Sequence, residues 1–74
     1  MVKMSAREVL IFGKRINRKV GHDVVTMEDL IYRSNQLNEN LWVIQCKEYS
    51  TTLWVWVQNN EKGELDVKKV KEIQ

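Results

Sequence analysis

The segment from Leu41 to Asn59, LWVIQCKEYSTTLWVWVQN, contains two β-prone apolar runs separated by a polar break at residues 49–51. This pattern predicts a β-hairpin. Both runs are apolar at nearly every position, so each strand should carry apolar side chains on both of its faces. Trp54 and Trp56 would share one face of the second strand. One face of the hairpin should therefore pack against helices, and the other face should need a different cover.

Length and composition indicate one small domain over residues 1–74, near the lower size at which a hydrophobic core is sufficient for folding. The chain is 43% hydrophobic and 30% charged, which is typical of a globular protein rather than a disordered or membrane-spanning one. No apolar run has the length of a transmembrane helix, and the N-terminus lacks the pattern of a signal peptide. We therefore expect a cytoplasmic protein without a membrane partner.

Upstream of the hairpin, residues 6–20 carry the signals of an amphipathic helix. Ser5 and Glu8 have the spacing of a capping box, and Gly21 stands where a left-handed C-terminal cap would lie. A second helix is predicted over residues 27–37, with Thr26 as its cap. The inner stripe of this second helix would consist of Met27, Leu30, Ile31, Ser34 and Leu37.

These elements predict an α+β fold, with two N-terminal helices packed on a three-stranded antiparallel β-sheet. The strands are expected at about 41–48, 52–59 and 64–71. In the third strand the apolar residues change phase at Lys68-Lys69, which allows either a strand with an irregularity or a strand that ends in a short helix.

An alternative fold has the order ββαβββ, with residues 8–25 as a β-hairpin. Two features of the sequence support it. Gly13 costs about 1 kcal/mol inside a helix relative to alanine, and the run Val9-Leu10-Ile11-Phe12 is β-prone.

Basic residues of the first predicted helix form the candidate nucleic-acid-binding set. These residues are Arg7, Lys14, Arg15, Arg18 and Lys19. On a helical projection most of them lie opposite the apolar side, where they could contact phosphates. Three further lysines, Lys68, Lys69 and Lys71, lie near the C-terminus. A solvated helix face that keeps the protein soluble is the competing interpretation.

Trp54 and Trp56 are candidates for stacking on bases or for a protein interface. Aromatic side chains exposed on a sheet are the stacking groups of many single-strand binders. The competing interpretation places the same pair in the hydrophobic core or in a dimer seam, which is common in a domain this small.

The sequence offers no recognisable set of catalytic or metal-binding residues. His22 is the only histidine and Cys46 the only cysteine, and they are far apart in the chain. Cys46 lies in an apolar strand and is expected to be buried. We expect neither an enzyme nor a bound metal or cofactor.

Two classes of function remain. The first is a small regulatory module that binds RNA or single-stranded DNA through the basic helix face. The second is a protein-protein interaction module, either homodimeric or an inhibitor-type regulator, that docks through the apolar sheet face bearing Trp54 and Trp56.

Overall fold

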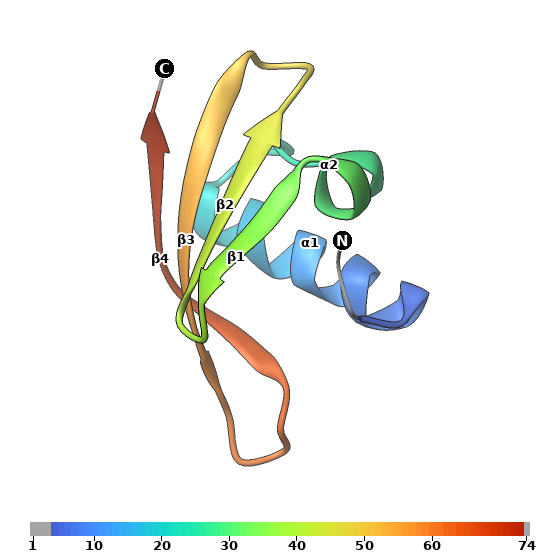
Figure 1. Ribbon diagram of the computed structural model, residues 1–74, viewed down its shortest axis with the longest axis vertical. Helices are drawn as coiled ribbons and strands as arrows, with labels where there is room; N and C mark the ends of the chain where they lie inside the picture. Colours follow the sequence, from blue (N-terminus) through green and yellow to red (C-terminus); the bar gives the residue numbers. More distant parts are fainter. Residues whose placement is uncertain (1–3, 74) are drawn as a thin grey trace.

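The computed structural model describes residues 4–73, in which two helices precede a four-stranded sheet. The elements are α1 (Ala6–Val20), α2 (Met27–Tyr32), β1 (Ser34–Asn38), β2 (Leu41–Cys46), β3 (Thr51–Asn59) and β4 (Leu65–Ile73). The strands are antiparallel and follow the order β1-β2-β3-β4. Both helices lie on one side of the sheet, and neither covers the other side (Figure 1).

The caps of α1 agree with the sequence signals. Ser5 Oγ accepts a hydrogen bond from Glu8 N at 3.2 Å, and Glu8 Oε1 accepts one from Ser5 N at 3.0 Å. Gly21 ends the helix with a φ of 101°, and its N–H donates to Asn17 O. The helix predicted over residues 6–20 is therefore confirmed, and the ββαβββ alternative is wrong.

The loop between the helices is held by the side chain of Asn17. Its Oδ1 accepts hydrogen bonds from Val24 N at 2.9 Å and from Val25 N at 3.0 Å, and its Nδ2 donates to Val25 O at 3.1 Å. α2 then begins with a second capping box, formed by Thr26 and the buried Asp29. The predicted start of this helix is confirmed.

The predicted end of the second helix is wrong, because α2 stops at Tyr32 and residues 34–38 form β1. The segment Ser34–Asn38 reads SNQLN, and serine and asparagine favour alternatives to a helix interior. As a strand, this segment pairs antiparallel with β2 and provides hydrogen-bond partners for the backbone N–H and C=O groups along its edge. Leu37, which the helical spacing assigned to the inner stripe, is 57% exposed.

The sheet has four strands rather than the predicted three, because β1 adds to the hairpin. The two predicted hairpin strands are present with shifted ends, and β4 is continuous to Ile73 instead of ending in a helix. β4 is irregular opposite Trp56 and Val57, which pair with Lys69 and Val67 and leave Lys68 as an extra residue. The phase change in the sequence therefore corresponds to a β-bulge.

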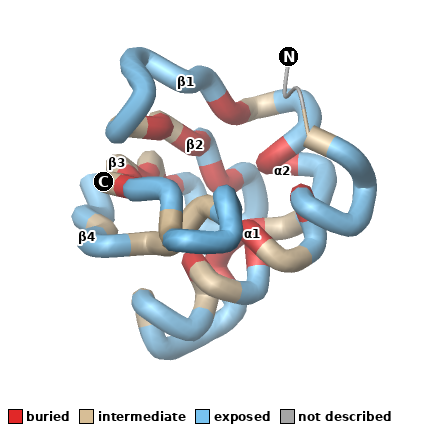
Figure 2. The backbone as a smooth tube through the Cα atoms, turned by 90° about the horizontal axis from the view of Figure 1, so that it is seen from below, coloured by how far each residue is buried: buried red, intermediate tan, exposed pale blue. Residues whose placement is uncertain are grey.

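The hydrophobic core lies between the helices and the inner face of the sheet. Its buried members are Val9, Phe12, Ile16, Val24, Val25, Leu30, Trp42, Ile44, Cys46, Leu53, Val55 and Val57. Phe12 and Trp42 meet edge to face, with ring centroids 5.5 Å apart. Figure 2 shows buried positions mainly in β2, β3 and the helices, whereas β1 and β4 at the edges are mostly exposed or intermediate. Neither helix described here is long and apolar enough to cross a membrane.

Candidate nucleic-acid interface

The side of the sheet turned away from the helices carries two of the three tryptophans. Along β3, Leu53, Val55 and Val57 are buried in the core, so the alternation of the strand turns Trp54 and Trp56 to the opposite side. Both indoles are partly exposed, and their ring centroids lie 6.1 Å apart at an interplanar angle of 46°. The tryptophan pair is therefore not part of the core of this chain.

Strand pairing determines which residues lie beside the two indoles. We define the outer face by its two central rows of paired residues, Leu41-Trp56-Lys69 and Val43-Trp54-Lys71. Leu41 and Val43 are partly buried, and both lysines are exposed. Each tryptophan thus has an aliphatic side chain on one side and a lysine on the other.

The bulge in β4 brings the lysines to this face. If β4 continued regularly from the pair Val57–Val67, Lys68 would face Trp56 and Lys69 would face the buried Val55. The extra residue instead places Val70 opposite Val55 in the core and Lys69 opposite Trp56. Lys69 Nζ lies 5.2 Å from the centroid of the Trp56 ring, within the range of a cation–π interaction.

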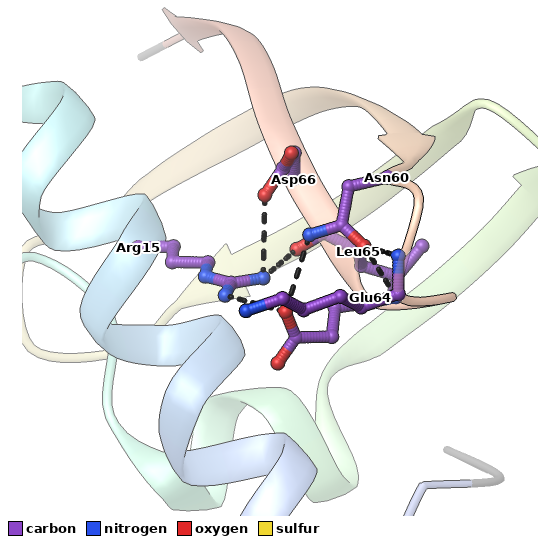
Figure 3. A network of polar contacts seen from close by, with 6 residues as sticks. Arg15, Asn60, Glu64, Leu65 and Asp66 are labelled. Carbon is purple, nitrogen blue, oxygen red and sulfur yellow. Dashed lines mark hydrogen bonds and ion pairs between the residues drawn. The ribbon is translucent and has the colours of Figure 1, made fainter.

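Arg15, a residue of the predicted basic set, is engaged within the protein. Its Nη1 donates a hydrogen bond to Leu65 O at 2.6 Å and lies 3.4 Å from Asp66 Oδ1, while Nη2 lies 3.6 Å from Glu64 Oε1. Figure 3 shows the Arg15 side chain directed from α1 towards the turn that precedes β4. A hydrogen bond from Asn60 to Glu64, followed by the charge of Arg15, lowers the pKa of the Glu64 carboxyl. Arg15 therefore ties α1 to β4.

The other four members of the basic set are exposed but do not form one cluster. Arg7 lies in the first turn of α1, roughly 16 Å along the helix axis from Arg18. Lys14 lies between them, and Arg18 and Lys19 occupy the last turn. Because α1 packs against the inner side of the sheet, these residues and the pair Trp54 and Trp56 lie on different sides of the molecule. The sequence predicts phosphate contacts from the basic helix face and base stacking by Trp54 and Trp56, but the structure does not bring these two groups of residues together.

Lys69 and Lys71 are the additional residues of the candidate interface. They were visible in the sequence only as part of a C-terminal lysine group, because their face depends on the position of the bulge. Leu41 and Val43 were visible as apolar strand residues whose second face needed cover. The phase change at Lys68-Lys69 was the one sequence signal that could have joined these lysines to the tryptophans.

Cys46 and Asp29 are two buried titratable residues. Cys46 is 1% exposed, and burial, together with the charges of Asp29 and Glu72, raises the pKa of its thiol to about 12. Asp29 accepts hydrogen bonds from Thr26 N and Lys47 N and lies 3.5 Å from Arg33 Nη1. Within residues 4–73, no group of three or more histidine, cysteine or acidic residues is arranged to hold a metal ion.

No protein-family model matches this chain, and neither a curated protein nor a solved structure is significantly similar to it.

Proposed function

We propose that this protein binds single-stranded nucleic acid, either RNA or DNA, on the outer face of its sheet. Trp54 and Trp56 stack on bases, and Lys69 and Lys71 contact the neighbouring phosphates. The proposal keeps the ligand class expected from the sequence and moves the binding surface from the helix to the sheet. The observation that carries it is the alignment of each tryptophan with a lysine across the β3–β4 pairing.

The energies of the competing contacts favour stacking on this face. Lys69 over Trp56 contributes about 0.5–1 kcal/mol at an exposed site. A base stacked on an aromatic side chain contributes about 1–3 kcal/mol, so a base can displace the ammonium group from the ring. The displaced lysine remains beside the ring on a flexible side chain, where it can pair with phosphate.

Charge argues against a homodimer formed through the same face. The rows that contain Trp54 and Trp56 carry two lysines and no carboxylate. A twofold interface would bring both copies of Lys69 and Lys71 together without an opposite charge, while the centres of protein interfaces are depleted in charged residues. An anionic partner meets both the apolar and the cationic parts of this surface.

The test is a titration of the protein with oligothymidylate and oligouridylate at low salt, followed by fluorescence anisotropy of the labelled strand. Trp54→Ala and Trp56→Ala should each weaken binding by about 1–3 kcal/mol. Tyr32→Ala is the matched control, because Tyr32 is a highly exposed aromatic residue on α2 and should leave binding unchanged. The thermal midpoint of each variant shows whether the fold is retained.

A second pair of variants separates local from general charge. Lys69→Gln with Lys71→Gln should weaken binding more than Lys47→Gln with Lys62→Gln, which removes the same charge from exposed positions outside the outer face. Absence of binding to either strand at low salt would refute the proposal. Light scattering that reports a dimer whose formation is abolished by Trp54→Ala would instead establish the protein-interaction alternative.

A further inference from the structure

Three cationic side chains lie together at the β4 edge of the sheet. They are on the side that faces α1 rather than on the outer face. Arg18 and Lys19 from the last turn of α1 and Lys68 from the bulge of β4 line one open surface hollow of about 450 Å³. We call it the edge hollow. Its remaining lining residues are Arg15, Asp66 and Val67.

The edge hollow has an excess of positive charge. Arg15 and Asp66 form an ion pair and largely cancel each other, whereas Arg18, Lys19 and Lys68 make no ion pair within residues 4–73. An anion in the hollow would therefore meet three uncompensated cations. Arg18 and Lys19 in the last turn of α1 interact favourably with the helix dipole, and a lysine such as Lys68 on an edge strand disfavours pairing with another chain. Neither effect explains why residues about 50 positions apart in the sequence lie together.

The bulge connects the edge hollow with the outer face. Lys68 and Lys69 are consecutive residues, so their Cα atoms are about 3.8 Å apart. Lys68 lines the hollow beside α1, while Lys69 lies over Trp56 on the outer face. β4 is an edge strand, so among residues 4–73 no further strand lies between the two surfaces. Positive charge is therefore continuous around the edge of the sheet, from Lys68 in the edge hollow to Lys69 on the outer face.

We infer that a bound single strand crosses the β4 edge and places further phosphates in the edge hollow, against Arg18, Lys19 and Lys68. This inference rests on the proposed function, because it extends the same bound strand. The outer face then holds stacked bases, and the edge hollow holds only the backbone. The protein should consequently prefer strands long enough to reach both surfaces.

Strand length and salt dependence test the inference together. A thymidine trinucleotide has two internal phosphates and should use only Lys69 and Lys71, with a log–log salt slope of about −1.4 at about −0.7 per phosphate. A decanucleotide should also use the three cations of the edge hollow, with a slope of about −3.5. Its affinity at low salt should exceed that of the trinucleotide by at least tenfold.

The discriminating variant is Arg18→Gln, Lys19→Gln and Lys68→Gln combined. It should return the slope for the decanucleotide to about −1.4 and remove its tenfold advantage, while binding of the trinucleotide stays unchanged. The matched control combines Arg7→Gln, Lys47→Gln and Lys62→Gln, which removes three exposed charges elsewhere and should retain most of the advantage.

Each other outcome overturns the inference in a recognisable way. Equal losses in the variant and the control would show general charge attraction without an edge site. A decanucleotide that binds no better than the trinucleotide would confine the ligand to the outer face and leave the proposed function intact. Decanucleotide binding that depends on the edge hollow but not on Trp54 or Trp56 would refute the continuous path and the proposed function together.

Discussion

Gly13 of α1 lies directly against Leu30 of α2, so closely that a Cβ added to the glycine would be 3.1 Å from Leu30 Cδ1. Both residues are buried. The glycine that weakens α1 as an isolated helix thus allows the two helices to approach each other. The close contact therefore requires a residue that lowers the stability of the helix by about 1 kcal/mol relative to alanine.

Substitutions at Gly13 should therefore depend steeply on side-chain size. Gly13→Ala should change the free energy of unfolding by less than about 1 kcal/mol, because the gain in helix propensity offsets a small displacement of the Leu30 side chain. Gly13→Val should destabilise the protein by about 1–3 kcal/mol through overpacking. Urea denaturation measures both values, and equal effects of the two variants would contradict the close contact.

The helical part of the fold was predictable where local signals dominate. Ser5, Glu8 and Gly21 determine the ends of α1 through contacts within a few residues, and the sequence displays such contacts directly. The start of α2 at Thr26 was predictable for the same reason. Gly13 was ambiguous in the sequence, because the residue whose close contact favours a glycine there, Leu30, lies 17 positions away in the chain.

The remaining features depend on pairing that local patterns do not specify. The segment 34–38 has helical spacing at Ser34 and Leu37 but becomes a strand because the edge of β2 is available beside it. The candidate site depends in the same way on one bulge. Which face of β4 carries Lys69 and Lys71 is set by the register against β3 and not by their spacing in the sequence.

The N-terminal caps provide a stability prediction. Ser5→Ala and Thr26→Ala should each lower the free energy of unfolding by about 1 kcal/mol, because each removes the acceptor for one N–H at a helix start. Chemical denaturation measures the change. Ser5→Asp, which retains an acceptor at the cap, should keep most of the stability, and a loss equal to that of Ser5→Ala would argue against capping as the cause.

Removal of the Asn17 side chain should be more damaging than removal of either cap. Asn17→Ala leaves the N–H groups of Val24 and Val25 without their acceptor, and a buried unsatisfied group costs about 1–3 kcal/mol. We expect a loss of at least about 2 kcal/mol in urea melts. Lys14→Ala, at an exposed position one turn earlier, should change stability by no more than about 0.5 kcal/mol.

Cys46 should make stability fall in alkaline solution. Burial raises the pKa of the thiol from its ordinary value of 9.0 to about 12 in the folded protein. Its contribution is fully present below about pH 9 and is lost as the pH rises towards 12, since only the unfolded chain ionises readily in that range. Denaturation from pH 8 to 11 should show a steeper decline for the wild type than for Cys46→Ala. All other residues are common to the two proteins, so their contributions cancel in this comparison.

Deletion of Lys68 should preserve the fold, because it removes the extra residue of the bulge and leaves the pairs Val57–Val67 and Trp56–Lys69 in register. We expect a change in stability of less than about 1 kcal/mol and unchanged cross-strand NOEs between Trp56 and Lys69. Deletion of Val70 shortens β4 equally but places Lys71 opposite the buried Val55, and should cost more than about 2 kcal/mol. The Lys68 deletion should also retain trinucleotide binding while weakening decanucleotide binding. Unfolding of this variant would show instead that α1 packs on β4 only when the strand is bent by its bulge.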